Sequence, residues 1–458
     1  MDLYGRLLAG ILFPAFEAAR GRPTRSLLRE LERTQWASRD ELHALQSRLL
    51  RRLARHAYRH TDHYRKVFDR RDLGPEDIGT PEDLAKLPLL DKDEARNTVE
   101  ARTSNAPPYA VVHKATSGST GQPMILAYNA ESRHYRDATR WRAYGWAGYR
   151  IGKRALHYWG FGAIPPVTRL GRLKVQLDHR LKRDHYIDCT PRGDAHLSNV
   201  VAEIERFHPE VIVAYAQAVT TLARFVLRTG NRRWGDIPIL CGAEPLLPPD
   251  REVVQQAFGP SVFDTYGARE FMLMASECEA HDGLHTSMET MIVELVVRTP
   301  DGAERPARPG ETGEVVITDL HNLAMPHIRY VNGDLAVQRD NTRCSCGRNL
   351  ARIGPIEGRV TDTLRDRAGN KVNGLVFNIL MVSIARHVQQ FQVVQHANDD
   401  ITLKIVPNGE LPDEARALVQ SFSSGYLPGI PVSIEIVEDL PPNQAGKRRP
   451  VVVECPRT

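Results

Sequence analysis

Residues 211–228 read VIVAYAQAVTTLARFVLR, an apolar run followed at once by a helical pattern. The run predicts a buried strand over Val211–Tyr215, and apolar side chains at helical spacing predict a helix over Thr220–Arg228. Strand–helix alternation of this kind predicts an α/β fold with a largely parallel sheet. The alternation continues on both sides, with predicted strands at Arg154–Tyr158, Ile237–Gly242 and Val262–Thr265 and predicted helices at Leu197–Phe207 and Asp250–Phe258.

The flanking segments indicate two domains. Leucines at spacings of three, four and seven predict helices over residues 24–70, within a helical preface that spans residues 1–100. After Gly358 the chain restarts with a smaller α+β pattern. We predict a large N-terminal domain over residues 1–357 and a small C-terminal domain over residues 358–458, with the boundary near 355–362. Further predicted strands are Met291–Val297, Gly313–Thr318, Val393–Gln395, Ile401–Val406 and Val432–Val437, and a further helix is Pro412–Phe422.

The composition is that of an ordinary globular protein, with 41% hydrophobic and 26% charged among 458 residues. The formal net charge of +5 is small for this length and argues against a basic nucleic-acid or membrane-surface binder. Two basic runs, residues 51–55 and 180–183, are predicted to be solvated helix faces rather than phosphate sites. Six cysteines in a chain of this length do not form a disulfide framework, so we expect a reducing, cytoplasmic setting.

The first sixteen residues are mostly apolar but lack a basic start and a small-residue cleavage site. They are therefore a poor signal peptide, and they are shorter than the roughly 20 residues that span a bilayer. We predict no membrane span and a helix docked on the body of the protein. An interfacial helix is the alternative.

A loop rich in glycine and hydroxyl groups, Thr116-Ser117-Gly118-Ser119-Thr120-Gly121, is the strongest local signal. Its N–H and hydroxyl groups can converge on phosphate oxygens. It is not a Walker A loop, because no Gly-Lys-Ser/Thr sequence follows the glycines. A plain turn between strands is the alternative.

A second motif, residues 264–270, leads from an apolar run into an aromatic residue, a glycine and a carboxylate. Tyr266 can present a flat face to a purine, since base–aromatic stacking contributes about 1–3 kcal/mol. Glu270 can hold Mg²⁺, which takes one or two carboxylates together with substrate phosphates. The alternative is a strand-to-helix turn with a solvated glutamate.

Two further motifs lie nearer the C-terminus. Asp334, after the turn-forming pair Asn332-Gly333, can accept hydrogen bonds from a ribose diol, although an Asn-Gly hairpin turn explains the same residues. Lys447, on a glycine-bearing loop, can reach a buried anion as a mobile point charge, although a basic tail turn is the commoner explanation.

These four motifs occur together and in order, and on them the sequence resembles the adenylate-forming superfamily of acyl- and aryl-CoA synthetases. The nearer resemblance is to the phenylacetate–CoA ligase family, especially its capsule-biosynthesis-associated branch. It covers nearly the whole chain and includes residues 31–36, 56–65 and 87–92. The resemblance implies an AMP-forming enzyme that activates a carboxylate with ATP, releases pyrophosphate and transfers the acyl group, by default to CoA. An amine, a hydroxyl or a carrier thiol is the alternative acceptor.

The resemblance also implies a role for each motif. The loop from Thr116 to Gly121 would grip the ATP phosphates, and Glu270 would coordinate Mg²⁺. Lys447 would bridge the carboxylate and the α-phosphate, on a C-terminal domain that rotates between the two half-reactions. The predicted nucleotide contacts are Gly242, Ala243, Glu244, Tyr266 and Gly267 around the adenine, and Asp334 and Arg359 at the ribose.

The sequence departs from the superfamily and family patterns in three motifs. Met124 stands where the superfamily has a lysine shortly after the loop, and Val331-Asn332 replaces Arg-Thr before the Gly-Asp pair. Thr361 replaces the usual hinge carboxylate after Gly358-Arg359, which bears on the domain rotation and on CoA as the acceptor.

Cysteine and histidine residues cluster in two short segments, and the family shows the same Cys…His and Cys-x-Cys pattern. Three thiolates and one imidazole suit a closed tetrahedral structural Zn²⁺ site. We predict Cys278, His285, Cys344 and Cys346 as its ligands, with His281 as a substitute ligand. Four unligated side chains are the alternative.

The acid is not identified by the sequence. Tyr135, Trp141, Tyr144, Trp146, Trp159 and Phe161 suit an aryl substrate, but we expect core packing for most of them. A non-catalytic nucleotide-binding component of polysaccharide biosynthesis is the competing function class. The retained Thr116–Gly121 loop, Glu270, Asp334 and Lys447 argue against it. The oligomeric state is left open, with a homodimer as the candidate.

Overall fold

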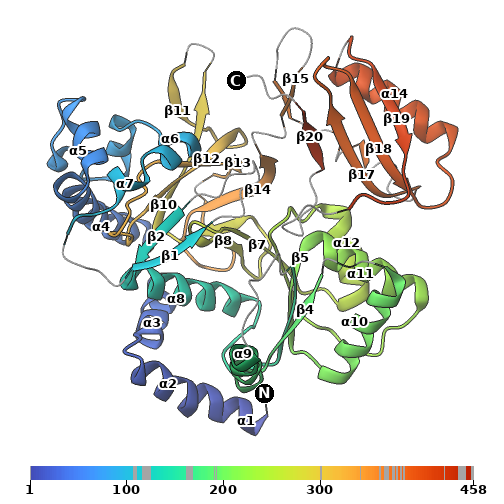
Figure 1. Cartoon of the computed structure of the whole chain (residues 1–458), viewed down its shortest axis with the longest axis horizontal. Helices are drawn as coiled ribbons and strands as arrows, with labels where there is room; N and C mark the ends of the chain where they lie inside the picture. The colour runs from blue at the N-terminus through green and yellow to red at the C-terminus, as the bar shows by residue number, and fades with distance from the viewer. Residues whose placement is uncertain are drawn as a thin grey trace.

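The computed structural model describes residues 2–106, 111–115, 125–160, 169–189, 191, 193–299, 302–340 and 342–359, and in the C-terminal part 363–365, 371–373, 377, 380–381, 384, 387–427, 429–441 and 450–454. Figure 1 shows a large body and a smaller C-terminal unit that lies to one side of it. The predicted fold class, α/β with a small α+β C-terminal unit, is confirmed.

One sheet of twelve strands runs through the large body in the order β11-β10-β12-β13-β14-β9-β8-β7-β6-β5-β3-β4. Strands β3 to β7 pair in parallel, as predicted, whereas β8 to β14 pair antiparallel. The sheet is mixed because helices connect the parallel strands and short turns connect β7, β8 and β9. The strands are β3 (Ala155–Trp159), β4 (Asp184–Asp188), β5 (Val211–Tyr215), β6 (Ile239–Gly242), β7 (Val262–Ala268), β8 (Met272–Glu277), β9 (Leu284–Thr286), β10 (Met291–Arg298), β11 (Glu304–Pro306), β12 (Thr312–Asp319), β13 (Tyr330–Gln338) and β14 (Arg352–Arg359).

The parallel half of the sheet is buried on both faces. In β5, Ile212 and Ala214 join one apolar cluster, and Val211 and Val213 join another on the opposite face. Side chains alternate across a strand, so a strand covered on both sides is apolar throughout, which is the pattern that the sequence shows. Helices α10 (Asp194–Phe207), α11 (Ala216–Thr229) and α12 (Pro248–Phe258) cover the first face, and α8 (Ala130–Trp146) covers the second.

The helical preface packs on the antiparallel half. Its longest helix, α4, begins after Ser38, whose hydroxyl accepts from the N–H of Glu41 while the Glu41 carboxylate accepts from the N–H of Ser38. The apolar stripe of α4 meets residues of the loop after β12, such as Leu320 and Ile328. The preface elements are α3 (Thr24–Thr34), α4 (Arg39–His60), α5 (Asp62–Asp69), η2 (Pro75–Asp77), η3 (Pro81–Lys86), α6 (Lys92–Asn97) and α7 (Val99–Arg102).

The chain begins with a helical segment of three pieces, α1 (Leu3–Leu7), η1 (Leu8–Leu12) and α2 (Phe13–Ala19). The Tyr4 hydroxyl donates to the Leu181 carbonyl at the end of α9 (Arg169–Lys182), at 2.9 Å. The predicted docking of this segment on the body is therefore observed. Among the described residues, no helix combines the length and the apolarity needed to cross a bilayer.

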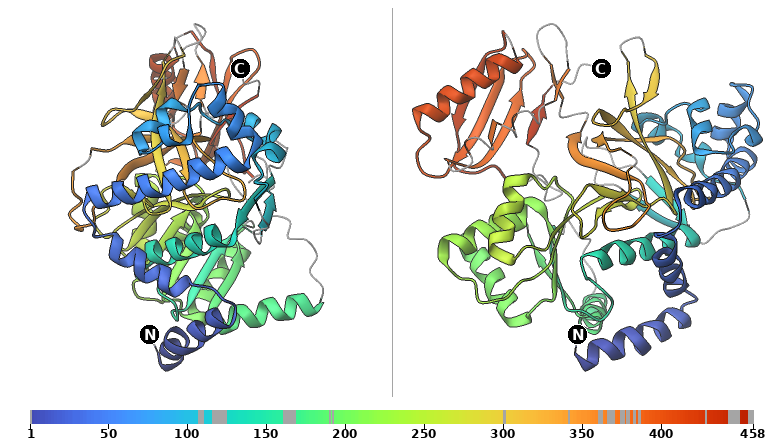
Figure 2. Two further views of the ribbon diagram at one scale, coloured as in Figure 1. Left: turned by 90° about the vertical axis from the view of Figure 1, so that its left-hand side faces the viewer. Right: turned by 180° about the vertical axis from the view of Figure 1, so that it is seen from behind.

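The C-terminal unit is a four-stranded sheet in the order β19-β18-β17-β20, with helix α14 (Asp413–Tyr426) packed against it (Figure 2). β14 still belongs to the large sheet, so that sheet ends at Arg359, inside the predicted boundary region. The remaining strands are β17 (Val388–Gln395), β18 (Ile401–Pro407), β19 (Val432–Ile436) and β20 (Val451–Val453), with two small hairpins, β1 (Val111–Ala115) with β2 (Ile125–Asn129) and β15 (Thr363–Arg365) with β16 (Lys371–Asn373).

Candidate functional site

The carboxyl ends of the parallel strands form one edge of the predicted nucleotide site. Gly242 ends β6, and Ala243 follows it with a left-handed φ of 67°. A non-glycine residue in that region stores strain, a feature that clusters at ligand sites. The buried Glu244 carboxylate accepts from the backbone N–H of Gln217 at 3.1 Å. In open α/β sheets ligands bind outside the carboxyl ends of the strands, so these residues lie where the sequence places an adenine pocket.

Two glycines at this edge leave no room for a side chain. A Cβ on Gly242 would lie 2.8 Å from Thr265 Oγ1, and a Cβ on Gly267 would lie 2.2 Å from the Met272 carbonyl oxygen. The first contact lets β6 approach β7, and the second lets β7 turn tightly into β8. Residues 264–270 therefore form a strand-to-strand turn, and the strand-to-helix alternative is wrong.

Asp334 is held by a cluster of hydrogen bonds. The Tyr266 hydroxyl donates to Asp334 Oδ2 at 2.8 Å, and the Asn332 amide donates to the same oxygen at 2.9 Å. The Asp334 N–H donates to Asn332 Oδ1 at 3.0 Å. Asn332 and Gly333 form a β-bulge within β13, where Gly333 has a left-handed φ of 80° and the register against β12 shifts, so the chain does not reverse there and the alternative of a hairpin turn is wrong. Because two donors fix Asp334, its carboxylate is preorganised for a hydroxyl-bearing ligand.

Tyr266 is largely buried, unlike an exposed aromatic ring on which a base could simply stack. Its ring is 7% exposed and packs in the core of the antiparallel half, while its hydroxyl reaches Asp334. The base-stacking role of Tyr266 remains a prediction, and the structure adds a positioning role.

Arg359 stands opposite Asp334. The two residues are Cα partners in the antiparallel pair of β13 and β14, so their backbones adjoin. The Arg359 side chain lies outside the described residues, and its ribose contact remains a prediction.

Glu270 lies in the turn between β7 and β8 and is half-buried. The Tyr330 hydroxyl donates to Glu270 Oε1 at 3.3 Å. Burial, and then the neighbouring Glu270 carboxylate, raise the pKa of Tyr330, so this phenol remains a donor at neutral pH. One oriented carboxylate beside a nucleotide site suits Mg²⁺, which takes its other ligands from phosphates and water.

Two predicted elements lie outside the part of the chain that the structure describes. The Thr116–Gly121 loop falls between β1 and β2, and only those flanking strands are placed. Lys447 lies between the described residues 441 and 450. Their predicted contacts with ATP phosphates stay predictions.

The predicted zinc ligands come together. The ligand atoms of Cys278, His285, Cys344 and Cys346 all lie within 4.8 Å of one another. The Sγ atoms of Cys278 and Cys344 are 3.7 Å apart, and Cys346 Sγ lies 3.4 Å from His285 Nε2. With zinc–sulfur bonds of about 2.3 Å, a regular tetrahedron has edges of about 3.8 Å. The donor set and its spacing therefore fit Zn²⁺.

The electrostatics of this Cys₃His cluster also suit a metal. His285 Nδ1 donates to the Leu350 carbonyl at 3.1 Å, which leaves Nε2 directed at the thiols as the ligand atom. Burial lowers the pKa of His285 to about 4, so the imidazole stays neutral. Burial raises the pKa of the Cys346 thiol, but hydrogen bonds from Arg348 and the other thiols leave it below its ordinary value. Metal ligands must be deprotonated thiols and neutral imidazoles, and these groups approach that state.

The substitute ligand His281 does not join the cluster. Its Nδ1 lies 3.2 Å from the Glu277 carboxylate, and its ring packs near Phe263. The prediction of His281 as a substitute ligand is wrong. His281 lies in the turn after β8 with a left-handed φ of 50°, and its ring contacts the Glu277 carboxylate instead of the thiols.

The cluster joins the sheet to the preface. The Arg348 side chain donates to Gln35 Oε1 at 3.1 Å and to the Glu279 carboxylate at 2.9 Å. Its guanidinium also lies 4.8 Å from the ring centres of both Trp36 and Trp146. The loop that carries Cys344 and Cys346 is therefore fixed to α3 and α8.

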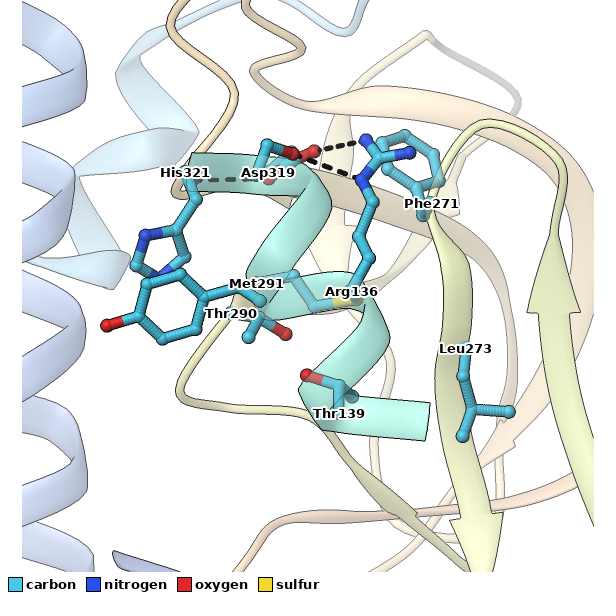
Figure 3. A pocket seen from close by; sticks show the side chains of 10 residues that line it. Arg136, Thr139, Phe271, Leu273, Thr290, Met291, Asp319 and His321 are labelled. Carbon is cyan, nitrogen blue, oxygen red and sulfur yellow. Dashed lines mark hydrogen bonds and ion pairs between the residues drawn. The ribbon is translucent and has the colours of Figure 1, made fainter. Parts of the chain in front are cut away.

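A small cavity lies between α8 and the antiparallel half of the sheet (Figure 3). Arg136 and Asp319 form a buried ion pair of 2.7 Å along it, and the Tyr135 ring stacks on His321 with ring centres 3.7 Å apart. Its volume of about 10 Å³ is close to the space for one water molecule. Tyr135 therefore belongs to packing, as expected for most of the aromatic residues, and this cavity does not accommodate an organic acid.

Three residues at the site were missed by the sequence reasoning. Tyr215 ends β5 and packs edge-on against Trp159 at 4.5 Å between ring centres, beside Gly242 and Glu244. Lys92 begins α6, and its Nζ lies 3.3 Å from the Cβ position of Gly333, next to Asp334. Gln217 holds Glu244. Tyr215 closes a predicted parallel strand and was open to prediction from that rule, whereas Lys92 approaches from 240 residues away and left no local signal.

Comparisons with known proteins identify relatives of this chain. The chain is 30% identical over 361 residues to phenylacetate-coenzyme A ligase of Pseudomonas putida, across 74% of this chain and 75% of that protein. It is 29% identical over 378 residues to the protein of the same name from Thermus thermophilus, across 80% and 82%. A family model described as the CapK C-terminal domain matches residues 364–454.

Among solved structures, 2-hydroxyisobutyryl-CoA ligase in its postadenylation state, in complex with R3-HIB-AMP, has the same fold. Its TM-score is 0.72 at 17% identity, over 91% of this chain and 90% of that one. The same ligase in its thioesterfication state, with 2-HIB-AMP and CoA, gives a TM-score of 0.58 over the same shares.

Proposed function

This chain belongs to the phenylacetate–coenzyme A ligase family of AMP-forming ligases, and we propose that it converts a carboxylic acid and ATP into an acyl-adenylate and pyrophosphate, then transfers the acyl group to coenzyme A. The acid is an organic carboxylate, with an aromatic one as the first to test. The proposed setting is the cytoplasm, and the proposed context is capsule polysaccharide biosynthesis.

One observation carries the nucleotide-binding part of this proposal. The Tyr266 hydroxyl in β7 donates to Asp334 in β13, and the neighbouring Thr265 hydroxyl donates to the Cys241 carbonyl of β6, the strand that leads to Glu244. Asp334 is fixed by Tyr266 and Asn332, which is what a ribose-binding carboxylate needs. Three further residues near these strand ends are constrained. Ala243 has a left-handed φ, and the positions of Gly242 and Gly267 leave no room for a Cβ.

In the first half-reaction, a carboxylate oxygen of the acid attacks the α-phosphorus of ATP. The new acyl–phosphate bond forms as the bond between the α- and β-phosphates breaks, and pyrophosphate leaves with the bonding electrons. Negative charge concentrates on the phosphates, so positioned cations and N–H donors supply most of the rate. We assign this role to the Thr116–Gly121 loop and to Lys447. No side chain becomes a covalent nucleophile.

In the second half-reaction, the thiol sulfur of coenzyme A attacks the acyl carbon. A thioester bond forms, the bond from the acyl carbon to the AMP oxygen breaks, AMP leaves, and the thiol proton passes to solvent. An amine or hydroxyl acceptor follows the same balance. Thr361, in place of the usual hinge carboxylate, is the feature that keeps such an acceptor as the second candidate.

Two metals fit the residues present. Glu270 would hold Mg²⁺, which screens the charge of the triphosphate. Cys278, His285, Cys344 and Cys346 would hold a structural Zn²⁺ with no open coordination position for catalysis, because four protein ligands close a tetrahedral site.

The test is a panel of carboxylic acids, aromatic and aliphatic, mixed with the full chain, ATP and Mg²⁺, with and without coenzyme A. The proposal expects pyrophosphate release that depends on one class of acid, and mass spectrometry should show the matching acyl-CoA only when coenzyme A is present. Acid-dependent pyrophosphate release with no thioester product would indicate that the acceptor of the acyl group is an amine or a hydroxyl instead of coenzyme A. ATP binding without release for any acid would favour a non-catalytic nucleotide-binding component.

A further inference from the structure

The first helical segment and α9 lie at the end of the molecule opposite the C-terminal unit (Figures 1 and 2) and carry a group of exposed apolar side chains, which we call the terminal surface. We propose that the terminal surface binds peripherally to a membrane that contains anionic lipid. It consists of Leu3, Tyr4, Leu7, Ile11 and Leu12 in the first helical segment and Val175, Leu177 and Leu181 in α9.

The first helical segment exposes large apolar side chains that a surface helix normally buries. A surface helix normally turns its apolar face to the core. Here Leu3 is 84% exposed and Ile11 is 61% exposed, whereas the buried positions of α1 and η1 are only Gly5 and Leu8. Leu8 is buried and Phe13 packs against Trp141, but the other large apolar side chains of α1 and η1 face away from the protein.

The exposure is concentrated rather than scattered. Thirteen large apolar residues are exposed among the described residues, and eight of them belong to the terminal surface. Single exposed apolar side chains need no explanation, but a contiguous group of them marks an interaction site.

The two parts of the terminal surface adjoin one another. The Tyr4 hydroxyl donates to the Leu181 carbonyl at 2.9 Å, and the Asp2 carboxylate pairs with Arg183 at 2.6 Å. Lys182 Nζ lies 5.9 Å from the centre of the Phe16 ring. Figure 2 shows α9 projecting from the body beside the first helical segment.

The charges around the terminal surface select the partner. Arg6, Arg20 and Arg180 are exposed, and none of them has a carboxylate partner within the described part of the chain. The nearby acids are already engaged. Asp2 pairs with Arg183 and Arg154, Glu17 is buried against Thr24 and Arg22, and Asp178 pairs with Lys182.

An anionic lipid surface fits this combination, because apolar side chains enter the acyl boundary while arginines meet the headgroups. A second copy of this chain fits it less well. A twofold contact brings the same patch against itself, so unpaired arginines would meet arginines with no free carboxylate to neutralise them.

The experiment is co-sedimentation of the full chain with vesicles of phosphatidylcholine alone or mixed with phosphatidylglycerol. We expect binding to the mixed vesicles at least roughly tenfold tighter than to the neutral ones, and weaker binding at high salt. Leu7→Ser with Ile11→Ser should abolish binding. Arg6→Glu with Arg180→Glu should weaken binding to the mixed vesicles by roughly tenfold or more, at about 1 kcal/mol for each basic residue.

Matched controls are Leu418→Ser with Ile436→Ser, two exposed apolar positions of the C-terminal unit, and Arg55→Glu on the exposed face of α4. Acid-dependent pyrophosphate release without vesicles should be the same in every variant, which verifies folding. The proposal is overturned if the wild-type chain does not sediment with mixed vesicles, or if the controls lose as much binding as the test variants. It is also overturned if sedimentation velocity shows a dimer that the apolar variants dissociate and no vesicle binding occurs.

Discussion

The Cys₃His cluster and the proposed nucleotide-binding region around Glu244, Tyr266 and Asp334, which we call the nucleotide edge, differ in how many separate segments supply their residues. The cluster takes its four ligands from two short segments, 278–285 and 344–346, and three of them are buried. The nucleotide edge collects Glu244, Tyr266 and Asp334 from three strands, and its remaining predicted members arrive from a loop and from the C-terminal unit. A closed site of this kind stabilises a fold, whereas a site assembled from separable parts suits a reaction with a moving partner. Substitutions in the two regions should therefore have separable effects.

The largest effect is expected from removal of the metal. Cys344→Ser should abolish stoichiometric zinc binding and lower the free energy of unfolding by about 4 kcal/mol or more, because loss of a structural metal is among the most destabilising changes. The measurements are elemental analysis of the purified chain and unfolding in denaturant. Cys189→Ala, a buried cysteine outside the cluster, is the control and should keep the zinc. If the wild-type chain contains no zinc and Cys344→Ser is as stable as the wild type, the cluster is not a structural metal site.

Lys447→Ala should produce the opposite pattern, with intact zinc and stability but slow chemistry. Loss of a cation that stabilises charge in the transition state costs about 10²–10³-fold in rate. Arg448→Ala, the neighbouring cation, should change the rate much less. The measurement is acid-dependent pyrophosphate release at saturating ATP. A Lys447→Ala enzyme as fast as the wild type would show that the lysine lies outside the chemistry.

Asp334→Ala should act mainly on the affinity for ATP. A hydrogen bond to a charged group contributes about 1.5–3 kcal/mol, so the KM for ATP should rise about 10- to 100-fold while kcat falls less. Asp340→Ala, an exposed aspartate just beyond the same strand, is the control. An unchanged KM in the Asp334 variant would remove it from the ribose contact.

Tyr266→Phe tests whether the phenol positions Asp334. Removing one donor while the Asn332 amide remains should raise the KM for ATP about two- to tenfold, because the second donor still holds the carboxylate and only part of the roughly 1.5–3 kcal/mol of a hydrogen bond to a charged group is lost from ATP binding. Tyr266→Ala should cost more, because it also empties a core position. If Tyr266→Phe equals the wild type, the hydroxyl has no positioning role.

The smallest effect is expected at the contact between the domains. The Arg224 guanidinium donates to the Gln389 carbonyl of the C-terminal unit at 2.8 Å and pairs with Asp250 at 3.1 Å. Asp250 accepts from Gln217, whose N–H in turn donates to Glu244. Arg224→Ala should slow pyrophosphate release about two- to fivefold, as loss of about 0.5–1 kcal/mol from a half-exposed contact predicts. The rate of thioester formation from preformed acyl-adenylate should not change in Arg224→Ala. An equal loss of rate in both steps would contradict the view that the contact between Arg224 and Gln389 serves the adenylation step alone.

Local pattern was sufficient for the parallel half of the fold. The predicted strand Val211–Tyr215 is β5 residue for residue, and the predicted zinc ligands converge, because Cys and His leave a signal that few other residues imitate. The antiparallel half was harder. β13 was ambiguous, since Asn332-Gly333 suits a hairpin turn locally, and only pairing with the neighbouring strands makes it a bulge within one continuous strand.

The site shows the same division. Gly242 and Glu244 follow from the family resemblance at the end of a predicted strand, and Asp334 follows from its glycine-bearing motif. Lys92 and the Arg348 contacts depend on segments hundreds of residues apart in sequence, so no local rule selects them. The reversed amphipathicity of the first helical segment was also hidden, because a helical pattern does not reveal which face meets the protein.

The most direct test of acyl-adenylate formation is isotope exchange between pyrophosphate and ATP in the absence of coenzyme A. The reversible first half-reaction predicts exchange that requires a carboxylic acid and Mg²⁺ and that fails in Lys447→Ala. Exchange without any acid, or none with any acid that supports ATP turnover, would contradict the central claim.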